Sequence, residues 1–398
     1  MTSLSRRELL QAGGAVAVSA AVPGLAYGQD LKGVTANEVR LGILHSLSGT
    51  FAIAETGMVD AEKLAIEEIN AAGGVLGRKI VPHIEDGASE APIFVEKANI
   101  LLRRHNVVGI IGCYSSALRK AVLPAIHQAK SVLFYPTYYE GQEMDKRCMY
   151  TAQEATQSVV PAVEYLIREK GKSIFLVGSD YIYPVTCNKI AKQAIARAGG
   201  TVAGEEYAPL GQTDFTAIIN KIRAAKPDAI YSTVVGGSNV AFYKQLKASG
   251  LGGDRMAIMS TLLVEDQVDG IGKEYTVDTY SCMGYFQSLK NPANEKFVKA
   301  FKSRYGQDRT IGYVMECGYN SVYIWKAAVE KAKSFKPDDV IAACAGIELD
   351  APGGKIRVDD KNHHVWMKVR IGKARADGQF DIVHETPEMV APNPFPKI

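Results

Sequence analysis

The chain has 398 residues, of which 47% are hydrophobic and 22% are charged, and this composition is that of an ordinary globular protein. A chain of this length is expected to form about two domains. The formal net charge of +3 is too small to favour a nucleic-acid partner or an anionic membrane surface. Beyond the N-terminal segment, no stretch approaches about 18 consecutive apolar residues, so we expect no membrane span.

The first 28 residues are expected to be an export signal and not part of the fold. Residues 5–10 read S-R-R-E-L-L, a twin-arginine pattern, and a weakly apolar segment follows at 12–26. Ala26 and Gly28 are small residues of the kind found at a signal-peptidase cleavage site. The alternative is a frayed amphipathic N-terminus. We therefore predict export to the periplasm by the twin-arginine route.

Strands and helices alternate from the start of the folded part. The expected strands are 39–44, 79–85, 107–112 and 132–135. Such short apolar runs are typical of buried parallel strands. The helix after the first strand carries one apolar face at three-and-four spacing and ends at Gly73 and Gly74. This β-α-β-α-β order predicts a parallel sheet covered by helices on both faces.

A second alternating series begins near residue 154. Its expected strands are 173–177, 201–207, 228–235 and 256–260, and its expected helices are 158–170, 184–198, 214–225 and 240–249. Two long helices follow at 292–305 and 312–332. Short antiparallel strands are expected last, at 355–358, 365–371 and 380–383, with turns at 352–354 and 377–378. This late return of strands predicts that the chain crosses between two lobes near 153, 284 and 349.

Loops rich in hydroxyl groups follow two neighbouring strands of the first series. One loop reads G-C-Y-S-S at 112–116, and the other reads Y-P-T-Y-Y at 135–139. In open α/β sheets, ligands bind at the carboxyl ends of the strands, so we expect both loops to line one binding site. The alternative is that Ser115 and Ser116 only cap the helix that follows them.

Several blocks carry a resemblance to a known family. They are L-G-I-L-H-S-L-S-G-T at 41–50, E-E-I-N-A-A-G-G-V-L-G at 67–77, G-C-Y-S-S-A-L-R-K-A-V-L-P at 112–124, F-Y-P-T-Y-Y-E-G at 134–141, G-S-D-Y-I-Y-P at 178–184 and D-A-P-G-G-K-I-R-V-D-D-K-N-H-H at 350–364. With these blocks the chain resembles type I periplasmic substrate-binding proteins of branched-chain amino-acid-type ABC transporters, and within them the urea and short-chain amide binders. Some blocks also resemble a cytoplasmic amide sensor, which keeps a regulator of the same fold as an alternative.

The resemblance implies an α/β fold of two lobes, each a parallel sheet flanked by helices, with a hinge cleft between them. Lobe 1 would comprise 38–153 and 284–348, and lobe 2 would comprise 154–283 and 349–398. The implied protein is a monomer without catalytic activity, cofactor or metal. It captures a solute by lobe closure and presents it to permease subunits of an ABC transporter in the inner membrane.

The resemblance also implies which residues contact the ligand. They are Tyr114, Ser116, Tyr135 and Thr137 in lobe 1 and Tyr181 and Tyr183 in lobe 2, with Thr233 and Glu265 as further candidates. Hydroxyl groups both donate and accept hydrogen bonds, which suits a small, planar, neutral amide or urea. A free amino acid would instead call for a buried carboxylate near its ammonium group, and the hydroxyl contacts provide none. Urea, acetamide, formamide and a branched-chain amino acid all stay open as ligands.

The remaining polar residues are expected to have structural roles. Glu140 and Asp180 are expected in turns, caps or hinges, and Arg119 and Lys120 are expected to be solvated. His363 and His364 are adjacent and would point to opposite faces of a strand, which disfavours one shared metal ion.

Six scattered cysteines form no C-x-x-C pair, so zinc is not expected, and free buried thiols compete with one or two disulfides. No hydrolase elbow, zinc-protease or Walker sequence occurs, so no enzyme is expected.

Overall fold

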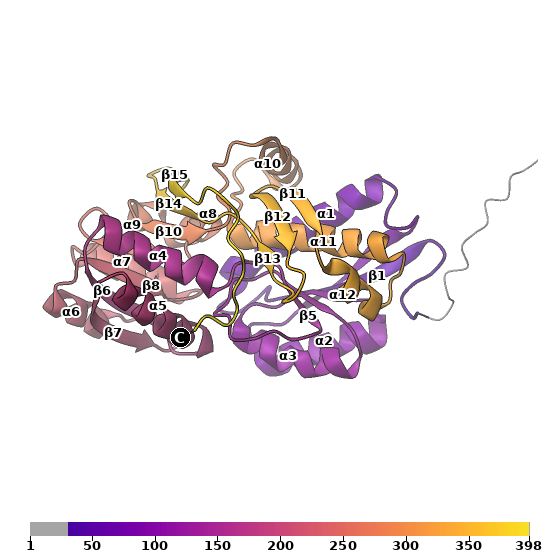
Figure 1. Ribbon diagram of the computed structural model, residues 1–398, viewed down its shortest axis with the longest axis horizontal. Coiled ribbons are helices and arrows are strands. Elements are labelled where there is room, and N and C mark those ends of the chain that lie inside the picture. Colours follow the sequence, from indigo (N-terminus) through magenta and orange to yellow (C-terminus); the bar gives the residue numbers. More distant parts are fainter. Residues whose placement is uncertain (1–30, 398) are drawn as a thin grey trace, which may run out of the picture. The chain divides into compact units, whose positions relative to one another are not determined.

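The computed structural model describes residues 31–397, and most of its strands belong to two sheets (Figure 1). The predicted signal segment, 1–28, lies outside the described residues. The first sheet is entirely parallel and has the order β2-β1-β3-β4-β5. Its strands are β1 Glu38–His45, β2 Lys79–Asp86, β3 Ile110–Gly112, β4 Leu133–Tyr135 and β5 Cys148–Tyr150. The predicted parallel sheet is therefore confirmed, and β5 is a strand that sequence reasoning missed.

The second sheet has the order β15-β14-β10-β9-β8-β6-β7. Its strands are β6 Ser173–Ser179, β7 Thr201–Ala208, β8 Ala229–Thr233, β9 Ala257–Ser260, β10 Tyr280–Met283, β14 Arg370–Ala374 and β15 Phe380–Glu385. Five of these strands run parallel, whereas β14 pairs antiparallel with both β10 and β15. The chain thus returns to this sheet near its C-terminus, as the late strands predicted.

A third, small antiparallel sheet is formed by β11 Glu348–Ala351, β12 Gly354–Val358 and β13 Val365–Trp366. The single strand predicted at 365–371 is wrong, because the chain leaves this sheet after Trp366 and joins the second sheet only at Arg370. His364 forms a β-bridge with Tyr150 at the edge of the first sheet. Residues 348–366 therefore do not belong to the second sheet, although the predicted lobe 2 includes the chain from 349 onward. The lobe boundaries themselves stay a prediction.

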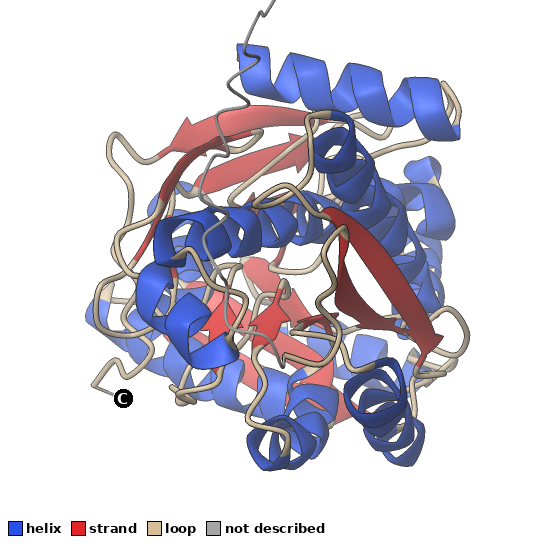
Figure 2. Cartoon of the chain, turned by 90° about the vertical axis from the view of Figure 1, so that its right-hand side faces the viewer, coloured by secondary structure: helices blue, strands red, loops and turns tan. Residues whose placement is uncertain are grey.

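Helices flank the strands (Figure 2). They are α1 Ala52–Ala71, α2 Ala91–Asn99, η2 Ile100–His105, α3 Ser116–Gln128, α4 Ala155–Glu169, α5 Ile182–Arg197, α6 Thr216–Ala225, α7 Ser238–Ala248, α8 Glu265–Ile271, α9 Lys273–Thr276, α10 Pro292–Tyr305, α11 Tyr313–Ala332 and α12 Pro337–Cys344. Between 31 and 397, no helix is both long and apolar enough to cross a bilayer. All six cysteines are buried free thiols, which decides against disulfides.

Candidate ligand-binding site

The loop after β3 begins at a glycine that the sheet requires. Gly112 has φ +143°, and a Cβ atom there would lie 2.1 Å from the carbonyl oxygen of Leu44 on the neighbouring strand β1. A side chain would therefore push β3 away from β1. The close approach directs the chain into the segment from Cys113 to Ser115, from which α3 starts.

The serine side chains at the start of α3 do not cap the helix. Ser115 occupies the N-cap position, but no side chain makes a capping hydrogen bond there. The Ser116 hydroxyl instead donates to Oε2 of Glu140, 2.5 Å away, and it accepts a hydrogen bond from Nη1 of Arg119 at 3.2 Å. The interpretation of these serines as plain caps is therefore wrong, and Ser116 faces the loop that follows β4.

Glu140 and Arg119 are both buried at this site, and for Arg119 this is contrary to expectation. Glu140 is 1% exposed and Arg119 is 0% exposed, so the prediction that Arg119 is solvated is wrong. The helix turn explains the error, because Ser116 and Arg119 are three residues apart and share the face of α3 that meets the loop. Lys120, one position further on, is partly exposed as predicted.

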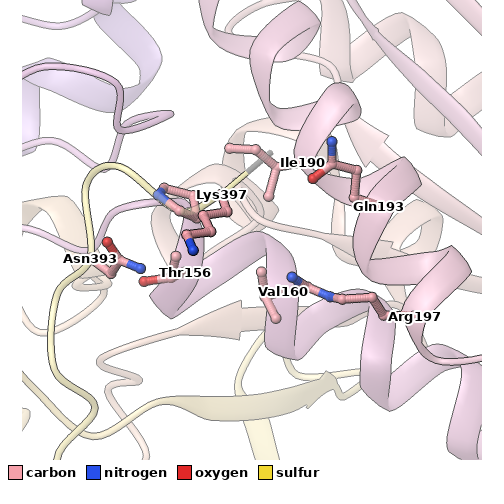
Figure 3. Close-up of a pocket in the computed structure, with 8 residues that line it drawn as sticks. Thr156, Val160, Ile190, Gln193, Arg197, Asn393 and Lys397 are labelled. Carbon is pink, nitrogen blue, oxygen red and sulfur yellow. The ribbon is translucent and has the colours of Figure 1, made fainter.

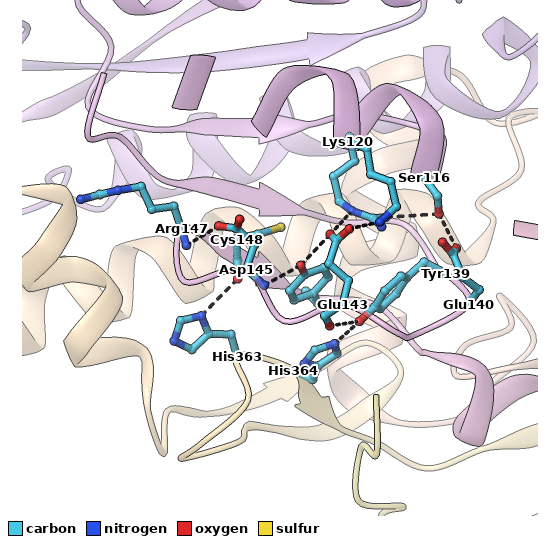
Figure 4. A network of polar contacts seen from close by, with 12 residues as sticks. Ser116, Lys120, Tyr139, Glu140, Glu143, Asp145, Arg147, Cys148, His363 and His364 are labelled. Atoms are coloured by element: carbon cyan, nitrogen blue, oxygen red, sulfur yellow. Dashed lines mark hydrogen bonds and ion pairs between the residues drawn. The ribbon is translucent and has the colours of Figure 1, made fainter. Parts of the chain in front are cut away.

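Three tyrosine rings surround the Arg119 guanidinium group, next to the polar contacts of Ser116, Glu140 and Glu143 that Figure 4 shows. Its carbon atom lies 4.5 Å from the ring centroid of Tyr135, 4.7 Å from that of Tyr139 and 5.7 Å from that of Tyr150. Such cation–π contacts are strongest when the cation is removed from water. Arg119 also donates from Nε to Glu143 at 2.8 Å. The ring contacts and this ion pair fix the position of a charge that would otherwise be costly to bury.

Glu143 is the carboxylate that balances Arg119. Burial alone would raise its pKa, but the charge of Arg119 and hydrogen bonds from Arg119, Lys120 and Tyr150 outweigh burial and hold the pKa at about 2. Glu143 is therefore ionised at neutral pH.

His364 anchors the same loop from the far end of the chain. Its ring stacks on Tyr150 with centroids 4.4 Å apart, and Nε2 lies 2.5 Å from the Tyr139 hydroxyl. Burial lowers the pKa of His364 to about 4, so the ring is neutral at physiological pH. Packing is one of the two roles, surface or packing, predicted for His364.

Tyrosine side chains from both sheets meet over this cluster. The hydroxyls of Tyr114 and Tyr138 lie 2.8 Å apart, and the Tyr138 ring is 6.2 Å from Tyr183 and 6.4 Å from Tyr313. Tyr138 lies in the loop after β4 and Tyr183 at the start of α5, so the two belong to different sheets. Sequence reasoning quoted Tyr138 within its loop but did not choose it as a contact.

Tyr181 joins this group from the loop after β6. The residue is half-buried, and its ring lies 6.3 Å from that of Tyr183. Burial of the hydroxyl is the main cause that raises its pKa well above the ordinary value, and the nearby acidic groups of Tyr135, Glu140 and Tyr138 act in the same direction. Burial likewise raises the pKa of Tyr114 and Tyr135. These phenols therefore stay protonated at neutral pH and can donate hydrogen bonds.

Other predicted contacts make internal hydrogen bonds. Thr137 donates to the carbonyl oxygen of Cys113 at 3.1 Å, which ties the two loops of the first sheet together. Thr233 is fully buried and donates to the carbonyl oxygen of Val177 at 3.3 Å, within the second sheet. The Tyr183 hydroxyl lies 3.3 Å from Thr261.

Glu265 lies at the first turn of α8, where its Oε1 accepts from the backbone N–H of Gln287 at 2.7 Å. Burial raises its pKa to about 8. No hydrogen bond or ring contact joins Glu265 to the tyrosine group within 31–397. The structure thus places Glu265 beside the segment that leaves β10.

The two halves of the site touch directly. The backbone N–H of Gly237, at the start of α7, donates to the carbonyl oxygen of Thr50 at 3.2 Å. Gly270 in α8 packs on Ile53 in α1, so closely that a Cβ atom there would lie 2.6 Å from the Ile53 side chain. The loops of the two sheets are therefore closed over the tyrosines.

A separate cavity of about 230 Å³ lies between α4, α5 and the C-terminal tail (Figure 3). Its lining is Thr156, Val160, Ile190, Gln193, Arg197, Asn393, Pro396 and Lys397. None of the predicted ligand contacts lines this cavity.

Two α/β sheets whose loops close over a buried polar cluster define a solute-binding protein. The chain belongs to the family described as periplasmic binding protein domain, whose model matches residues 39–398. The family is thus one of binding proteins, as its description states.

Curated relatives agree with this assignment over nearly the whole chain. The Leu/Ile/Val-binding protein homolog 7 of Brucella abortus is 23% identical over 372 residues, covering 87% of this chain and 91% of the relative. Homolog 8 of Brucella suis is 23% identical over 391 residues, covering 90% and 94%. A limonene hydroxylase of Geobacillus stearothermophilus is 36% identical over only 125 residues, which is 31% of this chain and 23% of that protein.

Solved structures confirm the fold. A solute-binding protein of an ABC transporter from R. palustris, in complex with 4-hydroxybenzoate, has a TM-score of 0.82 at 20% identity and covers 89% of this chain and 98% of that one. A leucine binding protein from Thermotoga maritima has a TM-score of 0.78 at 20% identity and covers 87% and 98%. The predicted two-lobed α/β fold is confirmed.

Proposed function

We propose that the protein is the periplasmic substrate-binding component of an ABC uptake transporter and that it captures a short aliphatic amide or urea. The observation that carries the ligand class is the convergence of neutral hydroxyls from the loops of both sheets, with Tyr114 and Tyr138 on one side and Tyr181 and Tyr183 on the other. Each hydrogen bond to such a ligand contributes about 1 kcal/mol net. Five or six of them, with packing against the rings, would support micromolar binding, about −8 kcal/mol.

The charges around the site support a ligand without net charge. Arg119 and Lys120 are positive, Glu140 and Glu143 are negative, and the hydrogen bonds among them form one connected group. An added carboxylate would give this balanced group a net negative charge, which is costly in a buried site; among the described residues, the one buried cationic donor left unpaired in the group is Nη2 of Arg119. This disfavours an aromatic acid such as the 4-hydroxybenzoate bound by the R. palustris protein.

The close packing of the rings supports a small ligand. Tyr114, Tyr138 and Tyr183 are each at most 3% exposed, and their hydroxyls and rings contact one another directly. Urea or acetamide needs far less space than a leucine side chain or a benzene ring.

A branched-chain amino acid is the second candidate, because of Glu140. A buried carboxylate is the natural partner of a ligand ammonium group, and the curated relatives are named as homologs of Leu/Ile/Val-binding proteins. Leucine should therefore be included in every binding assay. Binding of leucine in preference to acetamide and urea would favour this candidate over the first.

Replacing Tyr181 with alanine should weaken binding of the amide ligand at least about tenfold, which corresponds to about 1.4 kcal/mol. The half-buried Tyr181 ring lies in the loop after β6, 6.3 Å from the ring of Tyr183. Titration calorimetry on the purified protein measures the change. Tyr275→Ala is the matched control, because Tyr275 is also half-buried but lies on α9 against Lys244. Equal affinities of wild type and Tyr181→Ala would remove Tyr181 from the site.

A further inference from the structure

The hydroxyl of Ser116 already donates its only proton to another side chain. A serine hydroxyl has one proton to donate and two lone pairs that accept. The proton goes to Oε2 of Glu140 at 2.5 Å, and one lone pair accepts from Nη1 of Arg119 at 3.2 Å. The only capacity left on Ser116 is one lone pair, so toward a ligand this side chain can act as an acceptor but not as a donor.

Glu140 offers a second acceptor on the same side. Its Oε2 takes the Ser116 proton, whereas Oε1 has no hydrogen-bond partner among the described residues. Oε1 is also not fully enclosed by protein atoms, so it borders open space and not packed protein. Two acceptor positions, on Ser116 and Glu140, therefore lie next to each other at the floor of the site.

Two phenol groups supply donors beside these acceptors. The Tyr135 hydroxyl is fully enclosed and makes no well-aligned hydrogen bond in the described part of the chain. Its ring packs on Arg119, and Ser116 is near enough to influence its pKa as a weak hydrogen-bonding neighbour. Tyr181 likewise has no hydrogen-bond partner for its hydroxyl between 31 and 397, and its ring lies 6.3 Å from that of Tyr183, which in turn lies 6.2 Å from that of Tyr138 in the loop after β4. An unpaired buried hydroxyl carries a penalty of about 1–3 kcal/mol, which a ligand acceptor would remove.

We propose that Glu140 determines which side chains of the site accept hydrogen bonds from a ligand and which donate them. The site therefore takes a primary carboxamide, R–CO–NH2. The amide nitrogen has two N–H donors for Ser116 Oγ and Glu140 Oε1, and the carbonyl oxygen has two lone pairs for the hydroxyls of Tyr135 and Tyr181. This proposal rests on the proposed function and deepens it, because it names the end of the ligand that each side chain receives. Glu140 acts on the ligand both directly and by positioning the Ser116 proton.

The same arrangement of donors and acceptors disfavours ligands that have the shape of acetamide but lack its NH2 group. Acetone has the shape of acetamide but carries a methyl group where the amide has NH2, so it would leave both acceptors unpaired. A site built to hydrogen-bond a polar group rejects the analogue that lacks it far more strongly than size alone would. Urea fits the acceptors and the phenols, but its second NH2 group has no further acceptor in this arrangement.

The test compares acetamide and acetone as ligands of three proteins by titration calorimetry. Wild type should bind acetamide at least about 100-fold more tightly than acetone. Glu140→Gln replaces one carboxylate oxygen with an NH2 donor, so the site loses either the acceptor for the ligand or the acceptor for the Ser116 proton. Acetamide binding should therefore weaken at least about tenfold, while acetone binding changes less than about threefold. Glu154→Gln is the matched control, because Glu154 is also a buried carboxylate but caps α4 through the N–H of Thr156. It should keep the wild-type ratio.

The outcomes separate the two proposals. If wild type binds acetamide and Glu140→Gln keeps the wild-type ratio of acetamide to acetone affinity, the role of Glu140 is refuted and the proposed function survives. If wild type binds neither acetamide nor urea, the proposed function itself fails. If circular dichroism shows that Glu140→Gln does not fold, the test uses two other proteins. The ratio of acetamide to acetone affinity is then compared between wild type and Ser116→Ala. An equal affinity of wild type for acetone and acetamide would refute the assignment without any variant.

Discussion

Replacing His45 with leucine should lower the free energy of unfolding by about 3–5 kcal/mol. His45 ends β1 and is fully buried between two carboxylates, with Nδ1 2.8 Å from Glu55 and Nε2 2.8 Å from Glu62. Burial alone would lower the pKa of His45, but the two carboxylates outweigh it and raise the pKa to about 10. The imidazole is therefore charged at neutral pH, and leucine would leave two buried carboxylates without their cation. Denaturant unfolding curves measure the loss.

The matched control for this prediction is His127→Leu. His127 also pairs with a carboxylate, that of Asp145 at 2.7 Å, but its side chain is 35% exposed. Such partly exposed pairs contribute about 0–1 kcal/mol, so the control should lose little stability. Equal losses in both variants would contradict the account of His45 as the centre of a buried ion triad.

The same triad predicts a pH dependence. The folded pKa of His45, about 10, lies above the value of 6.5 for an unperturbed histidine, so its stabilisation is fully present below pH 6.5 and is lost as the pH rises through 10. Within this window the difference in stability between wild type and His45→Leu should shrink by up to about 1.4 kcal/mol per pH unit. Unfolding curves at pH 6, 8 and 10 check this prediction, and a constant difference would refute the charged state of His45.

Replacing Gly236 with alanine should weaken ligand binding at least about tenfold by holding the two sheets' loops apart. Gly236 has φ +59°, and a Cβ atom there would lie 2.7 Å from the carbonyl oxygen of Thr50 across the closed interface. The neighbouring Gly237 makes the hydrogen bond to the same oxygen. Because this oxygen belongs to the backbone, the collision is relieved only when the two sides separate. Calorimetry with acetamide or urea measures the lost affinity.

Gly250→Ala separates this effect from backbone strain. Gly250 has φ +76°, but no atom lies within 4 Å of a Cβ built there. Both substitutions should therefore cost stability for the same conformational reason, whereas only Gly236→Ala should lose affinity. A Gly236→Ala variant that binds as tightly as wild type would mean that contact between Gly236 and Thr50 is not needed for binding.

The sheets could be predicted because their strands are continuous apolar runs with helices between them. β4 and β6 follow such runs closely. β5 has three residues and lies after a polar loop, so no periodicity marks it. The run at 365–371 was divided between two sheets, and nothing in local hydrophobicity indicates where a chain changes its partner strand.

Part of the site could be predicted from the order of the strands. Hydroxyl residues after β3 and β4 had to meet at one edge of the sheet, which is where Tyr114, Ser116 and Tyr135 are found. Glu140 and Arg119 were missed because charged residues are rarely buried and a loop has no repeat that reveals its inner face. The three-residue spacing of Ser116 and Arg119 on α3 was the one available signal.

The most direct test of the central claim is titration calorimetry of the wild-type protein with acetamide, urea, leucine and 4-hydroxybenzoate in parallel. We expect acetamide or urea to bind with one ligand per chain and a dissociation constant of about micromolar size. We expect leucine and 4-hydroxybenzoate to bind at least about 100-fold more weakly, because neither is small and uncharged. Tight binding of leucine or 4-hydroxybenzoate, with no heat from acetamide or urea, would contradict the account.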